Sequence, residues 1–331
     1  MLDALGQYRL LGRIGTGRMG ELFRARDTRA GRTVAVRVVA GAIVNDPERR
    51  LRFLEEARAM TALSHPNIAA LYEVGEDQGR LFLVSEYVPG DTLKAVIAGR
   101  ALNPRHAIDH GIQLADALAD AHAEGIVLRD IRPSTIIITP KGIAKLIDVG
   151  LAAWTLGDGL AKADAVAYMS PEQVRGEQVD ERTDIFSLGV VVFEMIVGRP
   201  PFAGADAKAV GMQILQHHPP PPSTVNRTLP ADLDAIVLKM LAKSFDRRYE
   251  SAAALAGELR SVAAILDVRD GVTEPVNRVQ TNRRGARPGI WVALAVCAIA
   301  ALLLMAAGAG EISLASLTRA WRSLIGLALG L

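Results

Sequence analysis

Three glycines near the start of the chain have the spacing of a phosphate-binding loop. Gly15, Gly17 and Gly20 form the pattern G-x-G-x-x-G in the stretch IGTGRMGELFRARD. Glycine lets the backbone approach a ligand closely, so the N–H groups of such a loop can lie over phosphate oxygens. The residues after Gly20 alternate as in a strand, which predicts a hairpin at the glycines. Dinucleotide-binding folds share this spacing but need a helix there, and an ordinary turn would also account for three glycines.

The composition of the chain excludes several other kinds of site. Half of the 331 residues are hydrophobic, which is ample for a core, and a net charge of +2 gives no overall basic balance for nucleic acid. Cys297 is the only cysteine in the sequence, which excludes an internal disulfide and a metal cluster built on cysteines. The stretch MLDALGQYRLLG at the start contains an acid and no long apolar run, so no signal peptide is expected.

The elements that position the glycines can be predicted from the residue pattern that follows them. Runs rich in Val and Leu predict strands over residues 33–40 and 80–87. Between them, apolar residues recur at helical spacing over 46–63, where Asp46 suits the N-cap and Pro47 suits the first turn. A β-rich region with one helix is therefore expected to hold the glycine loop.

The chain as a whole is predicted to be an α+β protein with two lobes followed by one membrane helix. The small β-rich lobe comprises residues 1–88, and the larger, mainly helical lobe comprises residues 89–265, with a cleft between them. Residues 266–287 are polar and basic and form a juxtamembrane linker. The transmembrane helix is expected over 288–310, and residues 311–331 form a short amphipathic tail outside the cytoplasm.

The predicted membrane helix rests on a run of 23 uncharged residues, 288–310. At about 1.5 Å per residue, a helix of this length crosses a hydrocarbon core of about 30 Å. A buried core helix is the alternative, although the run has no polar face. Four arginines and no acid lie in residues 275–287, so the positive-inside rule places residues 1–287 in the cytoplasm. The protein is thus expected to cross the cell membrane once.

The amphipathic character of the tail rests on four residues. Leu314, Leu317, Trp321 and Leu324 recur at helical spacing and would form an apolar stripe able to lie on a membrane face. A disordered tail, or a helix that pairs with another helix, would explain these residues equally well.

Further motifs follow the glycines in a fixed order along the chain. The stretch VAVR ends at Arg37, Glu56 lies within the predicted helix, and the strand-like stretch LVSEYVPG then contains Glu86 and Val88. The later positions are Arg129-Asp130, Asp148-Val149-Gly150, Ser170-Pro171-Glu172, Asp184 and Arg248. Each motif alone is weak evidence, but a series in this order with these gaps is specific.

This series resembles that of the bacterial eukaryotic-like Ser/Thr protein kinases, over about residues 7–265. The stretches SHPNIAALYEVGE and AYMSPEQ are also similar to the family, and the predicted span after an arginine-rich segment resembles its membrane-anchored receptors. The resemblance implies a two-lobed protein-kinase-like fold that binds ATP with magnesium or manganese. It also implies transfer of the γ-phosphoryl group of ATP to protein hydroxyls.

The resemblance assigns ATP contacts to the small lobe and to the segment that follows its last strand. The assigned residues are Gly15, Gly17, Gly20, Arg37, Glu86 and Val88. Arg37 departs from the family, which has a lysine that pairs with the helix glutamate, here Glu56, and touches two phosphates. Arginine is longer, planar and forked, so it cannot occupy the same point without displacing something. Only seven of the 38 basic residues of the chain are lysines, so a general preference for arginine explains the residue at position 37. This preference does not restore the geometry of the family lysine.

Catalytic and metal-binding roles are implied for a second group of residues. Asp130 matches the aspartate that accepts the substrate proton, Arg132 replaces a lysine near the γ-phosphate, and Glu56 is the third catalytic residue. Asp148 matches the magnesium aspartate. Thr135 replaces the asparagine that holds a second metal; it is shorter and has no amide donor to brace the loop, so that metal should be held weakly. One site for magnesium or manganese is therefore expected, and a second remains in doubt.

Other matched positions are expected to serve the fold. Glu172 and Arg248 match a buried ion pair of the larger lobe, and Asp184 matches an aspartate that anchors the catalytic loop from below. In the activation segment Ala165 stands where the family usually has a threonine, and Arg129 has no obvious phosphothreonine partner. The fold is thus predicted to be intact, whereas the catalytic motifs are degenerate.

The sequence therefore predicts a membrane-anchored, ATP-binding kinase-like protein that is a pseudokinase or a very weak kinase. Its expected work is that of a signalling scaffold or regulator, with a protein substrate or a partner kinase, the membrane and ATP as its partners, and no nucleic acid. A homo- or hetero-dimer is compatible with this role. Two alternatives stay open: an active Ser/Thr protein kinase, and an interaction module that binds no nucleotide.

Overall fold

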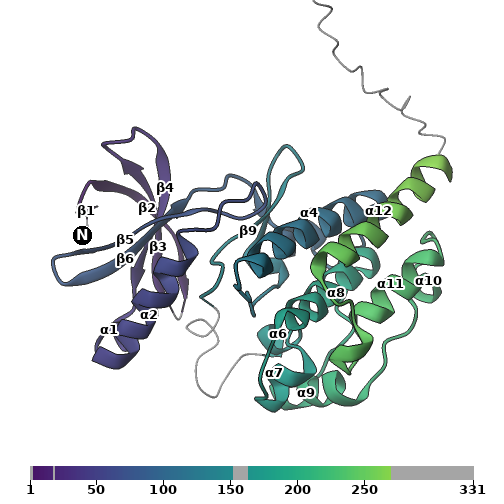
Figure 1. The fold of residues 1–331 in the computed structure, drawn as a ribbon. Coiled ribbons are helices and arrows are strands. Elements are labelled where there is room, and N and C mark those ends of the chain that lie inside the picture. The colour runs from purple at the N-terminus through teal and green to yellow at the C-terminus, as the bar shows by residue number, and fades with distance from the viewer. Residues whose placement is uncertain (1–2, 18, 152–162, 270–331) are drawn as a thin grey trace, which may run out of the picture. The chain divides into compact units, whose positions relative to one another are not determined.

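The computed structural model of the protein describes residues 3–17, 19–151 and 163–269 of the 331-residue chain. Residues 1–270 form one compact unit, and the rest of the chain, from residue 271, forms a second unit that lies outside the described residues. Two lobes are visible within the first unit, a β-rich one followed by a helical one (Figure 1). The predicted two-lobed α+β architecture is thereby confirmed.

The small lobe is built on an antiparallel sheet of six strands in the order β1-β2-β3-β4-β6-β5. The strands are β1 (Ala4–Leu5), β2 (Tyr8–Gly17), β3 (Gly20–Asp27), β4 (Thr33–Val39), β5 (Leu71–Asp77) and β6 (Arg80–Glu86). The Val- and Leu-rich runs predicted as strands are β4 and β6, each one residue shorter than expected. On one face of the sheet, Leu81 and Leu83 of β6 cluster with Phe53 and Ala57 of α2. On the other face, Val34, Val36, Phe82 and Val84 cluster with Leu5, Tyr8 and Ala25.

Two helices lie between β4 and β5, α1 (Gly41–Val44) and α2 (Pro47–Met60). The predicted start of α2 is confirmed, since the Asp46 side chain accepts a hydrogen bond of 2.8 Å from the backbone N–H of Arg49. Phe53, Ala57 and Met60 form the buried face of α2, at the spacing of three to four residues that one side of a helix requires.

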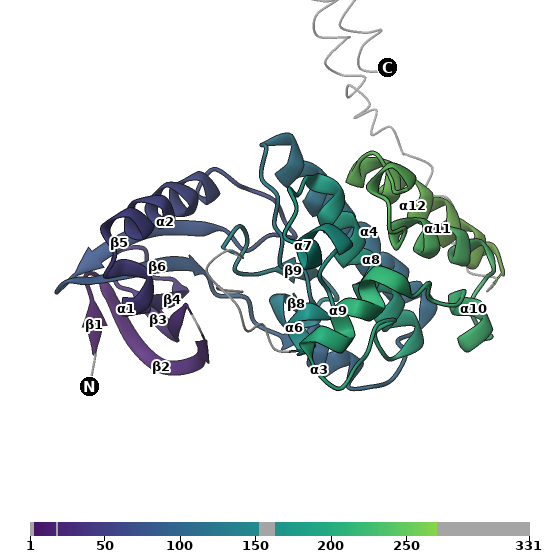
Figure 2. The ribbon, with the colours of Figure 1, turned by 90° about the horizontal axis from the view of Figure 1, so that it is seen from below.

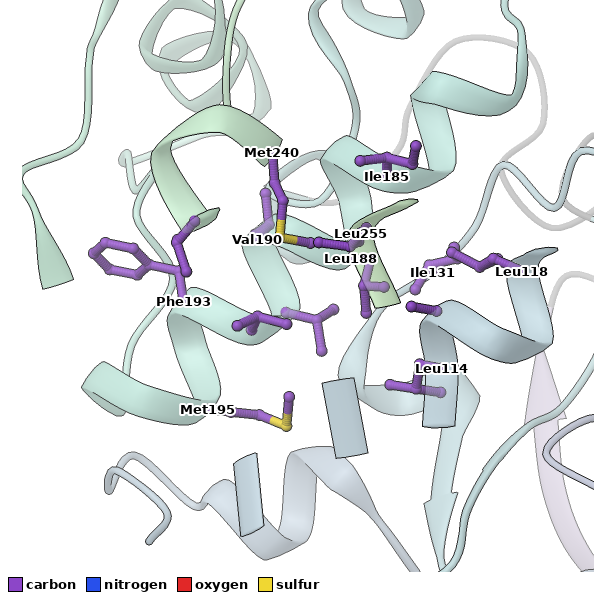
Figure 3. Close-up of a cluster of buried hydrophobic side chains, with 14 of the residues drawn as sticks. Leu114, Leu118, Ile131, Ile185, Leu188, Val190, Phe193, Met195, Met240 and Leu255 are labelled. Carbon is purple, nitrogen blue, oxygen red and sulfur yellow. The ribbon is translucent and has the colours of Figure 1, made fainter. Parts of the chain in front are cut away.

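The larger lobe has three long helices at its centre, α4 (Pro104–Ala123), α8 (Glu181–Val197) and α12 (Ala252–Arg269). Helix α4 packs against both α8 and α12 (Figure 2). The core between them consists of fully buried aliphatic side chains, with Leu114 and Leu118 from α4, Leu188 from α8 and Leu255 from α12 (Figure 3). This core gives the lobe a rigid base for the loops at its cleft side.

Shorter elements of the larger lobe surround these helices. A small antiparallel sheet in the order β7-β8-β9 comprises β7 (Asp91–Thr92), β8 (Ile136–Ile138) and β9 (Ala144–Leu146). The remaining elements are α3 (Leu93–Ile97), η1 (Pro133–Thr135), α6 (Ala163–Val166), α7 (Pro171–Arg175), α9 (Ala207–Gln216), α10 (Pro222–Val225), α11 (Asp232–Met240) and η2 (Phe245–Arg247).

The predicted membrane segment is not part of the described structure. Helix α12 continues to Arg269, four residues beyond the expected end of the larger lobe. Within the residues that the structure describes, no helix combines the length and the apolar character needed to cross a bilayer. The span over 288–310 and the tail over 311–331 lie outside these residues, as does nearly all of the linker over 266–287, so all three stay predictions.

Candidate active site

The three glycines lie where β2 turns into β3. Gly17 pairs with Gly20 across the turn, which confirms a hairpin and rules out the strand-to-helix turn of a dinucleotide-binding fold. Gly20 has a φ of +116°, and a Cβ there would lie 1.9 Å from the carbonyl oxygen of Val38, so a side chain is excluded. A Cβ on Gly17 would meet no described atom within 4 Å. Gly20 thus fixes the hairpin on β4, and the turn leaves room for a ligand.

The sheet register places an apolar patch next to Arg37. Leu22 of β3 pairs directly with Arg37 of β4, so their side chains share one face of the sheet. Ala35 lies two residues before Arg37 and therefore on the same face. Because Arg37 reaches the larger lobe from this face, Leu22 and Ala35 face the cleft and can cover the flat ring of a base. This arrangement fits the adenine end of ATP.

The segment after β6 connects the lobes and is held by an ion pair that sequence reasoning missed. Glu86 ends β6, and its carboxylate lies 2.7 Å from Nζ of Lys145 in β9. The backbone N–H of Glu86 donates to the carbonyl of Ala70 at 2.8 Å. Val88 follows and is half-buried. Since the Glu86 side chain is committed to Lys145, contacts of this segment with a nucleotide fall to its backbone and to Val88.

Asp184 anchors the catalytic loop, as the sequence predicts. Its buried carboxylate accepts hydrogen bonds from the backbone N–H groups of Leu128 at 2.8 Å and Arg129 at 2.7 Å, and it lies 2.9 Å from Nε2 of His122. Arg129 has a φ of +64°, a conformation that is costly for a residue other than glycine. The three contacts to Asp184 and a 2.8 Å bond from the Gln173 amide to the Arg129 carbonyl hold this strained turn in place.

Asp130, the predicted catalytic base, lies beside the predicted phosphate-binding cation of the same loop. One carboxylate oxygen of Asp130 is 2.7 Å from Nε of Arg132, and the side chains are 10% and 25% exposed. Asp130 makes a further polar contact of its own. A guanidinium in this position balances the charge of the base.

Thr135 corrects one expectation about the catalytic loop. Its hydroxyl lies 3.0 Å from the carbonyl oxygens of Asp130 and Arg132, and it accepts a hydrogen bond from the Arg132 N–H at 3.2 Å. The expected loss of a brace is therefore wrong, because the short hydroxyl bridges the loop from within. The same bonds occupy the hydroxyl proton and one of the oxygen lone pairs. Thr135 is also 7% exposed, which leaves its oxygen poorly placed as a metal ligand.

Arg37 pairs with the predicted metal aspartate and not with the helix glutamate. Its Nη2 atom lies 2.5 Å from a carboxylate oxygen of Asp148, which is 111 residues further along the chain. Among the described ion pairs, Asp148 is the partner of Arg37, whereas the family pairs its lysine with the helix glutamate. Glu56 is half-buried in α2 and has a polar contact of its own.

The backbone around Asp148 is held in an unusual conformation. Asp148 has a φ of +56° and Gly150 has a φ of +71°. The positive φ favours glycine at position 150, and a Cβ there would also lie 2.1 Å from the sulfur of Met60 in α2 and would displace that side chain. This packing fixes the turn that presents the Asp148 carboxylate to Arg37.

The residues of the site fit a nucleotide better than they fit a pair of metal ions. Magnesium requires near-octahedral oxygen ligands. One oxygen of Asp148 carries the Arg37 guanidinium, and the Thr135 hydroxyl is bonded to the loop backbone. In the part of the chain that the structure describes, no group of three or more acidic, His or Cys side chains converges. The Arg37 guanidinium therefore competes with the predicted metal ion for the Asp148 carboxylate.

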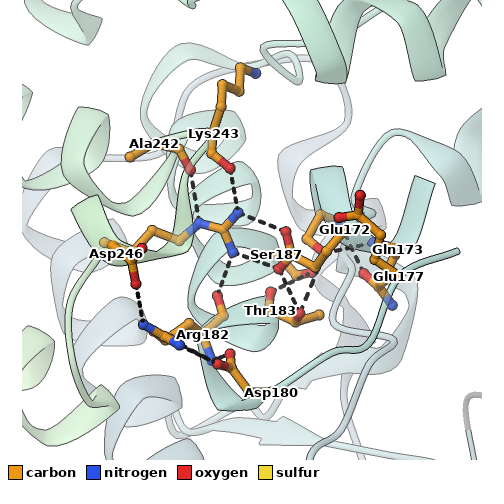
Figure 4. A network of polar contacts seen from close by, with 12 residues as sticks. Glu172, Gln173, Glu177, Asp180, Arg182, Thr183, Ser187, Ala242, Lys243 and Asp246 are labelled. Atoms are coloured by element: carbon orange, nitrogen blue, oxygen red, sulfur yellow. Dashed lines mark hydrogen bonds and ion pairs between the residues drawn. The ribbon is translucent and has the colours of Figure 1, made fainter. Parts of the chain in front are cut away.

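The predicted buried ion pair of the larger lobe is confirmed in full. Arg248 donates from both terminal nitrogens to the Glu172 carboxylate, at 2.7 and 2.8 Å, and Thr183 donates to the same carboxylate at 2.7 Å (Figure 4). Burial alone would raise the pKa of Glu172, but the hydrogen bonds from Arg248 and Thr183 outweigh it and lower the pKa to about 2. The pair ties α7 to the loop after α11.

The order of these residues and the two-lobed fold define a protein-kinase domain. Comparison with known proteins agrees, since the protein kinase domain model matches residues 8–258. The chain belongs to the bacterial eukaryotic-like Ser/Thr protein kinase family.

Two curated relatives illustrate the likeness in sequence. The chain is 37% identical over 296 residues to a probable serine/threonine-protein kinase of Streptomyces coelicolor, an alignment that covers 86% of this chain and 43% of that protein. It is 39% identical over 264 residues to the serine/threonine-protein kinase PknB of Mycobacterium tuberculosis, with 76% and 42% covered. The aligned part is therefore less than half of each curated relative.

A solved structure supports the fold. The crystal structure of the Mycobacterium tuberculosis PknI kinase domain matches with a TM-score of 0.64 and 25% sequence identity. The match covers 78% of this chain and 97% of that chain. Proteins of this family use ATP with magnesium or manganese in general.

Proposed function

We propose that this chain is an ATP-binding member of the family that transfers phosphate slowly or not at all. Its main work would be that of a signalling scaffold or a regulator of a partner kinase. The contact between Arg37 and Asp148 is the main support for this proposal, because it joins the predicted phosphate-binding residue to the predicted metal-binding residue. ATP binding is supported by the glycine hairpin and by the apolar face beside Arg37.

Phosphoryl transfer depends almost entirely on positioning and on charge stabilisation. Two positioning groups of the family are replaced here, the lysine by Arg37 and the asparagine by Thr135. A loss of about 10²-fold for each would amount to about 5.5 kcal/mol if the effects added, although groups that act as a unit seldom add. An activation barrier raised by this amount would make phosphoryl transfer very slow and would leave ATP binding intact.

The other residues of the site retain roles that a nucleotide-binding regulator would use. The glycine hairpin can cover the phosphates, and Asp184 keeps the catalytic loop in shape. Asp130 stays the candidate proton acceptor of the loop, with Arg132 at one of its two carboxylate oxygens.

An active Ser/Thr kinase is the second candidate function, and the Thr135 brace favours it. The loop is held in shape without the asparagine, and Asp130, Asp148 and Glu56 are all present. An interaction module that binds no nucleotide is the third candidate, and the open glycine turn argues against it. Binding and transfer of labelled ATP separate the three candidates.

The deciding experiment repairs the two replaced residues. Phosphorylation of the chain itself and of a generic basic protein is measured with labelled ATP for wild type, Arg37→Lys, Thr135→Asn and the double variant. We expect little transfer by wild type and a gain in the double variant larger than the product of the single gains, because both groups act on one phosphate chain. An Asp130→Asn version of the double variant is the control for transfer by contaminants.

One outcome would contradict this proposal, and another would contradict the cause assigned to the slow transfer. Robust transfer by wild type would mean that Arg37 serves the phosphates directly and that the protein is an active kinase. No gain in the double variant would move the cause to the activation segment, where Ala165 stands in place of a threonine.

We also propose that residues 288–310 anchor the protein in the cell membrane, with the kinase domain in the cytoplasm. The uncharged run and the arginines before it support this topology. Reporters fused to each end of the full chain test it. Activity of an N-terminal reporter outside the cytoplasm would contradict it.

A further inference from the structure

The guanidinium of Arg37 has unused hydrogen-bonding capacity at the mouth of the site. A guanidinium carries five N–H donors in a rigid planar fork. Arg37 uses one of them on Asp148, and this is its only polar contact among the described residues. Four donors therefore remain for a ligand that approaches from the cleft. The side chain is 11% exposed, so such a ligand would meet a largely desolvated cation.

The phosphates of a nucleotide are the ligand that the surroundings favour. Gly20, which follows the glycine turn, pairs with Val39, two residues from Arg37 along β4. Phosphates below that turn would thus lie within reach of the guanidinium. Arginine binds phosphate oxygens with two parallel hydrogen bonds, a geometry that a lysine ammonium cannot supply.

The charge of Asp148 would oppose a nucleotide if the carboxylate stood alone. A triphosphate carries several negative charges, and a carboxylate a few ångströms away repels it. A cation between the two removes the repulsion. Magnesium is the cation that the family uses in general, but here Arg37 is already in contact with the carboxylate.

We propose that the Arg37 guanidinium takes the place of a divalent cation at Asp148, so that this chain binds ATP without magnesium. The inference rests on the proposed function as an ATP-binding protein and specifies how the phosphates are held. A metal ion would have to share the Asp148 carboxylate with a guanidinium that already balances its charge, and the Thr135 hydroxyl, which is bonded to the loop, is poorly placed to add a ligand. Magnesium should therefore add little to the affinity.

The surroundings of the pair leave room for Arg37 to contact phosphate as well as Asp148. The Asp148 side chain is 28% exposed, and a cavity of about 30 Å³, room for one or two water molecules, borders Arg37 and Asp148. Met60, Leu83 and Ser85 form part of its lining. The guanidinium can therefore turn toward phosphate while it keeps its bond to the carboxylate.

The test measures ATP affinity by titration calorimetry on the purified full chain in detergent, once with EDTA and once with millimolar magnesium. For wild type we expect the two dissociation constants to agree within about threefold. Arg37→Met removes the cation and frees Asp148, so binding in EDTA should weaken by about tenfold or more, and magnesium should restore part of it. Arg37→Lys, which keeps the charge but loses the fork, should also become dependent on magnesium.

Each result bears on a different part of the argument. Wild-type binding that requires magnesium would overturn this inference and leave the ATP-binding function standing. Binding in neither condition would overturn both. Undiminished binding of ATP by Arg37→Met in EDTA would also overturn the inference, because the phosphates would then be held elsewhere. Arg37→Lys keeps the test decisive if the Met variant does not fold, and circular dichroism checks both variants.

Discussion

Two arginine–carboxylate pairs of this domain differ in how completely they are enclosed. In the larger lobe, the side chains of Arg248 and Glu172 are 0% and 5% exposed, and each terminal nitrogen of the arginine bonds to its own carboxylate oxygen. In the cleft, the side chains of Arg37 and Asp148 are 11% and 28% exposed and share one hydrogen bond. The first pair matches the family, whereas the second joins the arginine that replaces the family lysine to the predicted metal aspartate.

The two pairs differ in how many hydrogen-bond donors of the guanidinium are available to a ligand. Arg248 also donates to the backbone carbonyls of Ala242, Arg182 and Lys243, so its donors are consumed inside the protein. A buried charge is tolerated only under such conditions, because every missing partner costs the full desolvation of the group. Arg37 keeps unused donors and borders the cleft. The enclosed pair therefore holds the fold, and the open pair is available to a ligand.

The largest effect should follow from breaking the enclosed pair. Arg248→Met leaves the Glu172 carboxylate buried without its main partner, which should lower the free energy of unfolding by about 3–5 kcal/mol. Urea unfolding followed by circular dichroism measures the change. Arg260→Met is the matched control, because Arg260 pairs with Asp116 on the surface and its loss should cost about 1 kcal/mol or less. Equal losses in the two variants would contradict the contrast.

A second, smaller effect should appear in acid. The pKa of Glu172 is lowered in the folded protein to about 2 from an ordinary value of 4.5. A carboxyl group with a lowered pKa contributes stability that is complete above its unfolded pKa and is lost as the pH falls through the folded pKa. The stability advantage of wild type over Glu172→Gln should therefore shrink as the pH falls from 4.5 toward 2. An advantage that is constant over this window would mean that Glu172 is not held as an anion.

The enclosed pair was predictable from the sequence, and so was the frame around it. Glu172 and Arg248 lie 76 residues apart, but each of them, like Asp184, belongs to a motif whose order along the chain indicates its role. The Asp46 cap of α2 followed from local rules, because a capping carboxylate bonds to a residue three positions away. Local patterns and ordered motifs were therefore sufficient for the architecture and for the anchors of the catalytic loop.

The open pair was not predictable by the same means. The sequence indicated that Arg37 must displace something, but the choice between Glu56 and Asp148 depends on side-chain reach across the cleft. The length of the Thr135 side chain does not predict the brace, because the tight turn of η1 brings the carbonyl oxygens of the loop to the hydroxyl. Such contacts are set by tertiary geometry.

The smallest effect should come from breaking the open pair, and it gives the sharpest comparison. Arg37→Met makes the same replacement as Arg248→Met, also at a largely buried arginine. The two variants therefore differ mainly in the carboxylate that loses its partner, Asp148 or Glu172. Asp148 is partly exposed and can be hydrated once Arg37 is gone, and methionine fills most of the vacated space between the lobes. We expect a loss of about 1 kcal/mol or less, which for a domain of this size lowers the melting temperature by about 2–4 °C at most. Thermal unfolding of both variants measures it. A loss as large as that of Arg248→Met would mean that Arg37 and Asp148 hold the lobes together. In that case Arg37 could not turn toward phosphate without destabilising the fold each time ATP binds.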